Sequence, residues 1–220
     1  MTVTVVVGAQ WGDEGKGRVI DYLAERADMV IRFQGGDNAG HTVVNDQGRF
    51  ALHLIPSGVF DPEAYCLLWP GTVVNMDALG EELDALRRAG VAARNVRVDY
   101  RAHLVLPYHR LLDGAAEEQR KREAGAEEPA EGEMGTTRRG IGPVYGDKHS
   151  YRGVRVGDIR YPDVLRQRLE ALLPARNAQL AFYGLPPCSV EDLLALAEGW
   201  RTAYGDMIVD SLPVVRAAVQ

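Results

Sequence analysis

Two glycine-rich segments near the start of the chain hold the side chains that could do chemistry. The first, residues 8–17, reads Gly-Ala-Gln-Trp-Gly-Asp-Glu-Gly-Lys-Gly and separates the apolar run 3–7 from an amphipathic stretch that begins near Arg18. A strand, a glycine loop and a helix start in this order bring backbone amides and the positive end of a helix to a phosphate. Lys16 adds a point charge and Asp13 a carboxylate. The segment therefore predicts a nucleotide-phosphate site.

The loop departs from both common phosphate-binding motifs. A P-loop has G-x-x-x-x-G-K-[ST], whereas Gln10 stands five residues before Gly15, and Gly17 stands where the magnesium-binding Ser or Thr would be. The glycine order does not match the dinucleotide motif G-x-G-x-x-G either. The prediction rests on glycines that let a backbone approach a polyanion, together with the lysine and the acid.

Three roles are open for Asp13 on the residues alone. A carboxylate among phosphates and a divalent cation can ligate the metal or abstract a proton. Asp is also a preferred N-cap residue, so it could simply begin the next helix.

The second segment, residues 34–42, reads Gln-Gly-Gly-Asp-Asn-Ala-Gly-His-Thr and follows the apolar run 29–33. In a parallel sheet the loops after neighbouring strands open at the same edge, so His41 could face Asp13 across a ligand. A single histidine is more often a structural hydrogen-bonding residue than a catalyst, and that alternative stays open here.

Four segments in this order resemble the signatures of the adenylosuccinate synthetase family. They are residues 8–17, residues 34–42, Leu-His-Leu-Ile-Pro-Ser-Gly at 52–58, and Gly-Ile-Gly-Pro at 140–143 with Tyr145, Asp147 and Lys148. The resemblance implies a GTP-dependent carbon–nitrogen ligase of purine synthesis, which makes adenylosuccinate from IMP, L-aspartate and GTP with Mg²⁺. It covers only the N-terminal half of the family pattern, because the later aspartate-binding and guanine-reading motifs are absent. We therefore expect the chain alone not to catalyse the full reaction.

The resemblance implies a role for each matching residue. Asp13 matches the general base and His41 the general acid, and Asp13 with the backbone carbonyl of Gly40 matches the magnesium ligands. The residues that match the GTP and metal site are Gly12, Asp13, Glu14, Gly15, Lys16, Gly17, Arg18, Gly40, His41 and Thr42. The residues that match the IMP site are Asp13, Glu14, Gly15, Lys16, Asn38, Ala39, Gly40, His41, Thr137 and Arg152.

Two positions depart from the family pattern. Arg138 replaces a glycine in the segment that carries Thr137, so we expect its backbone to avoid the φ values that glycine tolerates best. In the family an arginine at the position of Tyr151 reaches the partner's IMP across a homodimer interface. Arg152 is next to it, but on an extended segment a shift by one residue reverses the face. Either the register shifts or the contact between subunits is changed.

Composition agrees with a soluble, cytoplasmic member of such a family. The chain has 220 residues, 46% of them hydrophobic and 25% charged, with a formal net charge of −6. The negative charge and the absence of a basic patch argue against a nucleic-acid or anionic-membrane partner. Cys66 and Cys188 lack C-x-x-C spacing, and no apolar stretch approaches the length of a membrane span.

Apolar periodicity predicts an α/β fold: a mainly parallel central sheet with a strand–glycine-loop–helix phosphate site and surrounding helices. The expected strands are 2–7, 29–33, 65–69 and 96–99, with a hairpin over 42–54. The expected helices are 18–26, one from Asp77 with Leu79, Leu83 and Leu86 on one face, and 161–173, 175–183 and 189–204, the last capped by the pair Ser189 and Asp192.

Residues 1–220 are expected to form the N-terminal portion of one such α/β domain, with a charged and mobile surface excursion near 114–133. We expect the histidines outside the second segment to be structural, although His53 lies close to that segment in the pattern. Two functions remain open: a synthetase half that keeps Asp13, Lys16 and His41, or a nucleotide-binding module that has lost the chemistry.

Overall fold

The computed structural model describes residues 2–9, 15–124 and 135–220. Its centre is a parallel sheet of four strands in the order β1-β4-β6-β8. Two further pairs, antiparallel β2–β3 and parallel β5–β7, lie outside this sheet. The strands are β1 (Met29–Arg32), β2 (His41–Asn45), β3 (Gly48–Leu52), β4 (Tyr65–Leu68), β5 (Val73–Val74), β6 (Val96–Asp99), β7 (His103–Leu104) and β8 (Ile208–Val209). The α/β prediction with a mainly parallel sheet is confirmed.

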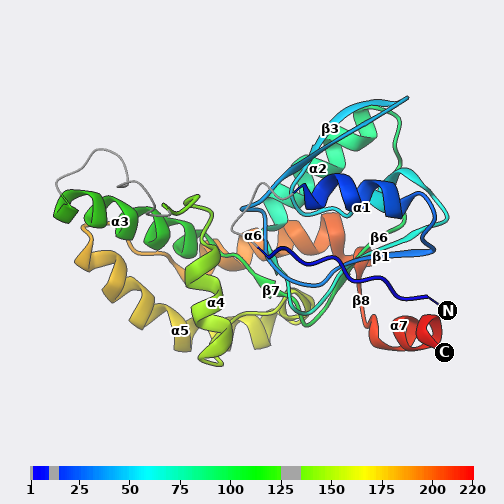
Figure 1. The fold of residues 1–220 in the computed structure, drawn as a ribbon. Coiled ribbons are helices and arrows are strands. Elements are labelled where there is room, and N and C mark those ends of the chain that lie inside the picture. Colours follow the sequence, from blue (N-terminus) through cyan, green and yellow to red (C-terminus); the bar gives the residue numbers. More distant parts are fainter. Residues whose placement is uncertain (1, 10–14, 125–134) are drawn as a thin grey trace.

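Helices surround the sheet, and three of them, α3, α4 and α5, gather at one end of the molecule, at the left of Figure 1. The α-helices are α1 (Lys16–Ala24), α2 (Met76–Arg88), α3 (Pro107–Ala124), α4 (Ile141–His149), α5 (Pro162–Phe182), α6 (Val190–Tyr204) and α7 (Leu212–Val219). Short 3₁₀ helices are Ser57–Phe60, Val156–Arg160 and Gly205–Met207. None of the helices in the described ranges is long and apolar enough to cross a membrane.

The helix α2 shows how the sequence sets a boundary and a buried face. The Asn75 side chain accepts hydrogen bonds from the backbone N–H groups of Asp77 and Ala78, which otherwise lack a partner in the helix. Leu79, Leu83 and Leu86 are completely buried, as their spacing predicts. For α6 the Ser189 half of the expected capping pair is confirmed, because the Ser189 side chain accepts the backbone N–H of Asp192 at 3.0 Å.

The expected first strand, residues 2–7, is wrong. None of the strand pairings in the described part of the chain includes these residues, and Val3, Val5 and Val7 are 64%, 68% and 69% exposed. An apolar run becomes a strand only where a neighbouring strand takes up its backbone hydrogen bonds. Of the strand, loop and helix expected around residues 8–17, the helix α1 is confirmed and the strand is not found. Most of the loop lies outside the described residues.

Two helical expectations also change. Residues 161–173 and 175–183 form one continuous helix, α5, with Pro174 in its interior. An interior proline costs about 3 kcal/mol, and the burial of Leu165, Leu169, Leu173 and Leu180 offsets it. The charged segment after Gly114 stays helical to Ala124, further than expected. Its remainder, 125–133, lies outside the described residues, so the mobility of that part stays a prediction.

Replacing Leu79 by alanine should test the core beneath α2. The side chain is completely buried, so Leu79→Ala should lower the free energy of unfolding by about 2–5 kcal/mol, through lost burial and the cavity left behind. Leu111→Ala on α3, where the leucine is 38% exposed, is the matched control and should cost about 1 kcal/mol or less. Urea unfolding followed by circular dichroism measures both, and equal losses would contradict the assigned core.

Candidate functional site

The N-terminus of α1 presents the described part of the first glycine segment. Gly15 is the N-cap residue, with φ 74°, and Lys16 is the first helical residue. No side chain caps this end, so its first-turn N–H groups remain suited to an anion. Gly12, Asp13 and Glu14 lie outside the described residues, whereas Arg18 is exposed on the first turn of α1.

His41 begins β2 and lies directly against α1. A Cβ atom at Gly17 would come within 2.5 Å of the His41 Cβ, so the glycine makes this close approach possible. The His41 Nε2 lies 2.8 Å from Ser57 Oγ and 3.5 Å from Asp21 Oδ1. The structure thus brings the two glycine segments together, and it does so through Gly17 and His41.

Burial lowers the pKa of His41 below its ordinary value of 6.5. The negative charge of Asp21 opposes this shift, while the positive charge of Arg32 and the neighbouring His53 add to it. The imidazole is therefore neutral at pH 7. A neutral imidazole still has one N–H to donate, which is the form needed to hydrogen-bond an oxygen that gains negative charge.

The loop between β1 and β2 carries the remaining residues of the second segment. Asn38, Ala39 and Gly40 are exposed, and Thr42 is exposed on β2. The ring of His53 packs against Gly40, where a Cβ would lie 2.8 Å from its Nε2. Gly40 can therefore present its backbone to a ligand on one side while His53 covers the other.

Two charged side chains, the buried Glu82 and the half-buried Arg32, bind the backbone around this loop. Glu82 on α2 accepts backbone N–H groups of His53, Leu54 and Ile55 at 3.0, 2.9 and 3.1 Å. The Arg32 guanidinium, at the end of β1, donates to the carbonyl oxygens of His53 and Gly36.

The segment before α4 contains Thr137, which is exposed. The expectation for its neighbour is wrong: Arg138 has φ 57°, in the left-handed region. A non-glycine residue can adopt this conformation at a cost of about 1–2 kcal/mol. The Arg138 backbone N–H donates to Thr136 Oγ1 at 3.1 Å and its guanidinium pairs with Glu118 at 3.2 Å, contacts that help to hold it there.

Tyr151 and Arg152 follow α4 in a turn and do not lie on the extended segment that we expected. Tyr151 has φ 60° and is 96% exposed. The Arg152 N–H donates to the Asp147 carbonyl at 2.9 Å, which closes the helix end in the manner of a Schellman motif. Both side chains are exposed, so the alternation of faces on a strand does not decide between them.

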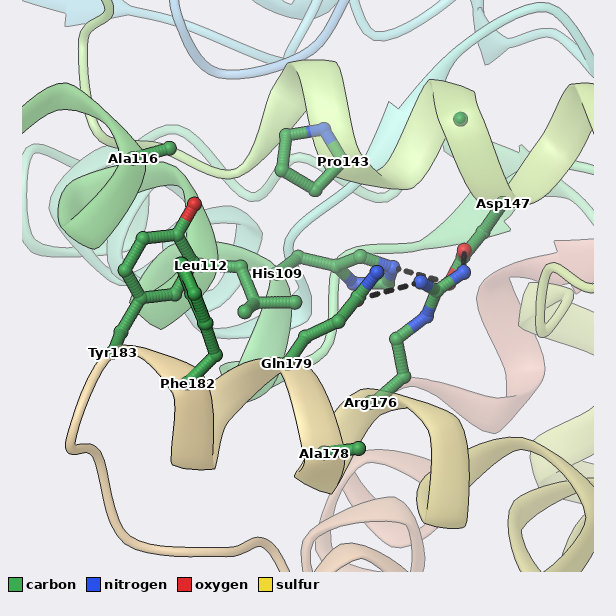
Figure 2. Close-up of a pocket in the computed structure, with 11 residues that line it drawn as sticks. His109, Leu112, Ala116, Pro143, Asp147, Arg176, Ala178, Gln179, Phe182 and Tyr183 are labelled. Carbon is green, nitrogen blue, oxygen red and sulfur yellow. Dashed lines mark hydrogen bonds and ion pairs between the residues drawn. The ribbon is translucent and has the colours of Figure 1, made fainter. Parts of the chain in front are cut away.

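A second polar cluster lies between α3, α4 and α5, beside a cavity of about 680 Å³ (Figure 2). The carboxylate of Asp147 accepts hydrogen bonds from Tyr108 and His109, both at 3.0 Å, and pairs with Arg176. The other ring nitrogen of His109 accepts the Leu106 N–H at 2.8 Å, so this imidazole is neutral. Burial also lowers the pKa of His109, which favours the same neutral form. The cluster anchors α4 to its neighbours.

Sequence reasoning gave no role to Asp21, Ser57 or Glu82, although each contributes to the site. Ser57 lies inside the quoted segment 52–58, and Asp21 follows Gly17 by four residues, one helical turn on the same face. That spacing could have indicated Asp21. Glu82 gave no signal, because only the fold brings it to residues 53–55.

The fold and this site define an α/β protein whose helix N-terminus and second glycine loop meet around His41, an arrangement suited to phosphate-bearing ligands. The family model "Adenylosuccinate synthetase" matches residues 5–220. The chain therefore belongs to the adenylosuccinate synthetase family.

Curated and solved relatives agree. The chain is 46% identical over 220 residues to the adenylosuccinate synthetase of Dehalococcoides mccartyi, covering 100% of this chain and 50% of that protein. It is 43% identical over 215 residues to adenylosuccinate synthetase 1 of Methanosarcina acetivorans, with 98% and 48% coverage. The solved structure of the fully ligated Plasmodium falciparum enzyme is similar with a TM-score of 0.81 and 32% identity, over 96% of this chain and 47% of that one. The chain spans about half the length of these relatives.

Gly17→Ala should displace His41 from its half-buried position. The new Cβ would approach the His41 Cβ to 2.5 Å, so one of the two must shift. Because burial lowers the pKa of His41, we expect its pKa to rise toward 6.5 when the ring becomes more exposed. Titration of the histidine ring signals by NMR measures this. Gly199→Ala on α6, where a Cβ meets no atom within 4 Å, is the control, and identical His41 curves in all three proteins would contradict the contact.

Proposed function

We propose that this chain carries the phosphoryl-transfer centre of an adenylosuccinate synthetase, which joins L-aspartate to IMP with the use of GTP. The observation that carries the proposal is the contact of α1 with His41, which joins the two glycine segments in a chain of this family. Here Gly12 to Arg18 bind the GTP phosphates, and Asn38 to His41 contact IMP while Gly40 to Thr42 border GTP. Phosphoryl transfer needs mostly such positioning and electrostatic stabilisation.

The chemistry divides between two side chains. Asp13 takes the N1 proton of IMP, so that O6 can attack the γ-phosphorus of GTP and release GDP. His41, neutral and held near Ser57, donates a hydrogen bond where charge builds between GTP and the purine. The amine of aspartate then attacks C6 of the 6-phosphoryl intermediate, and inorganic phosphate leaves.

Mg²⁺ fits the oxygen-rich character of the proposed donors. The carboxylate of Asp13 and the carbonyl of Gly40 would hold it, and nucleotide phosphates would complete its shell. Within the described ranges no group of three or more His, Cys, Asp or Glu side chains could bind a metal ion alone. The ion would neutralise developing phosphate charge.

The IMP phosphate and the partner subunit complete the proposal. Thr137 is exposed on the segment before α4, where it would bind this phosphate. Arg152, or Tyr151 beside it, is exposed and would face a second copy of the chain in a homodimer. We place the enzyme in the cytoplasm, where purine nucleotides are made, without nucleic-acid or membrane partners.

A second function, a nucleotide-binding module without catalysis, is favoured by one observation. Tyr151 stands where the family has an arginine that reaches IMP, so one contact of the family's substrate site is changed in this chain. The two functions differ in whether IMP is turned over when this chain is part of a full-length protein.

The Asp13→Asn substitution tests the base in a full-length context. The amide keeps the shape of the carboxylate but cannot accept the N1 proton, so kcat should fall about 10²-fold or more while IMP and GTP still bind. Product formation followed by chromatography, with ligand affinity from calorimetry, separates the two effects. Asp46→Asn, at an exposed turn, is the control. A mutant with more than about a tenth of the activity would contradict the base assignment.

Nucleotide binding by the chain itself should be weak and nearly indifferent to the base. Its phosphate loop is present, but the family segments that read guanine lie outside it. Calorimetric titration with GTP, ATP and IMP in Mg²⁺ should give similar, poor affinities, and Lys16→Ala should weaken GTP further by removing the cation at the start of α1. Tight GTP-selective binding, or adenylosuccinate formation by this chain, would show that the missing segments are unnecessary.

A further inference from the structure

Three consecutive residues of the second glycine loop each contact a residue of α4 or of the segment just before it. The Gly35 N–H donates to the Tyr145 hydroxyl at 2.9 Å. A Cβ at Gly36 would come within 2.5 Å of Ile141 Cδ1, so the backbone is in close contact with this side chain. The carboxylate of Asp37 lies 3.3 Å from the Arg139 guanidinium. Segments more than a hundred residues apart in the chain therefore meet along a line of contacts.

Two of these contacts are firmly anchored. The Tyr145 hydroxyl also donates to the Gly71 carbonyl at 2.8 Å, and Ile141 packs with the buried Val73 and Val144. They fix the first part of the loop. The third contact differs, because the Arg139 side chain is 40% exposed and its pairing with Asp37 can be broken without opening the core.

Asp37 stands where the loop changes from buried to exposed. Gly36 and Asp37 are buried, whereas Asn38, Ala39 and Gly40 are exposed. The Asp37 Oδ2 accepts the Asn75 amide at 3.1 Å as well as the Arg139 contact, while Oδ1 is buried without a hydrogen-bond partner in the described part of the chain. A buried carboxylate is costly unless an opposite charge is near, so the ion pair with Arg139 stabilises Asp37 in its buried position.

We infer that Asp37 and Arg139 are positioning residues that couple the exposed part of the loop, Asn38 to His41, to the segment Thr136 to Gly140. When the pair is formed, order in one segment is transmitted to the other. Because coupling free energy is reciprocal, a ligand that orders Thr137 also stabilises His41 in its position in this structure. A ligand that orders His41 likewise stabilises the position of Thr137. The inference rests on the proposed function only for the identity of that ligand, a nucleoside monophosphate.

The coupling can be measured without any ligand. In Asp37→Asn the new amide oxygen still accepts from Asn75, but the charge facing Arg139 is lost. The Gly140 N–H, next to Arg139 in the chain, donates to Asp113 and reports on this segment. Its hydrogen exchange should quicken about fivefold, which corresponds to a loss of about 1 kcal/mol in the free energy of local opening. Arg139→Gln should quicken exchange in residues 38–41 by a similar factor, and Arg139→Lys, which keeps the charge, should largely restore it.

The matched control is Arg138→Gln, which removes the same charge one residue away, where Arg138 pairs with Glu118 and not with the loop. It should leave exchange in residues 38–41 unchanged. The inference is overturned if each substitution alters exchange only in its own segment, or if Arg138→Gln has the same effect as Arg139→Gln. If Asp37→Asn fails to fold, the exposed Arg139 variants still decide the question.

Titration with IMP then tests the functional consequence. Asp37→Asn and Arg139→Gln should each lower the affinity for IMP about fivefold. The double variant should bind IMP no more weakly than the weaker-binding single variant, as expected when both residues act through one contact. Additive losses would overturn the coupling. If the unsubstituted chain binds no IMP at millimolar concentration, the proposed ligand is wrong, while the exchange experiment still decides the coupling.

Discussion

The geometry of the site depends on one buried carboxylate, Glu82. It accepts three consecutive backbone N–H groups, those of residues 53–55, where the chain leaves β3. Removing it would leave three N–H groups in the interior without a partner, each of which costs about 1–3 kcal/mol. Burial raises the pKa of Glu82, and the backbone hydrogen bonds oppose that rise by favouring the charged form. The neighbouring Arg32 provides the compensating positive charge.

Fixing residues 53–55 fixes what lies on either side of them. His53 covers Gly40, and Ser57 follows two residues after the bonded segment and contacts His41. Arg32 then holds the carbonyls of Gly36 and His53 together. A side chain on α2, in no direct contact with His41, therefore sets the environment that keeps this imidazole neutral. The chemistry proposed for His41 therefore depends on Glu82 of α2, through the backbone of residues 53–55 that Glu82 holds in place.

Much of the fold could be predicted from sequence, because its signals are local. Alternating or buried apolar runs gave β1, the β2–β3 hairpin, β4 and β6, and the caps Asn75 and Ser189 explain where α2 and α6 begin. What failed depended on tertiary contacts. Residues 2–7 have the composition of a strand but no pairing in the described residues, and Pro174 is held inside α5 by leucines that pack on the core. The left-handed φ of Arg138 likewise follows from contacts with Thr136 and Glu118 that no local pattern announces.

The residues of the family motifs fall into two groups: those whose side chains hydrogen-bond to the protein, and those that are exposed. Tyr145, Asp147 and Lys148 make their hydrogen bonds to the protein: Tyr145 to Gly35 and Gly71, Asp147 to Tyr108 and His109, and Lys148 to the carbonyls of Pro70 and Gly71. Their occurrence in the motif is explained by the attachment of α4. Asn38, Gly40, Thr42 and Thr137 are exposed instead, on the two segments that the first group and the Asp37–Arg139 pair hold together. One motif can therefore contain residues whose polar atoms attach the helix to the protein and residues that are exposed, and hydrogen bonding distinguishes them where resemblance alone does not.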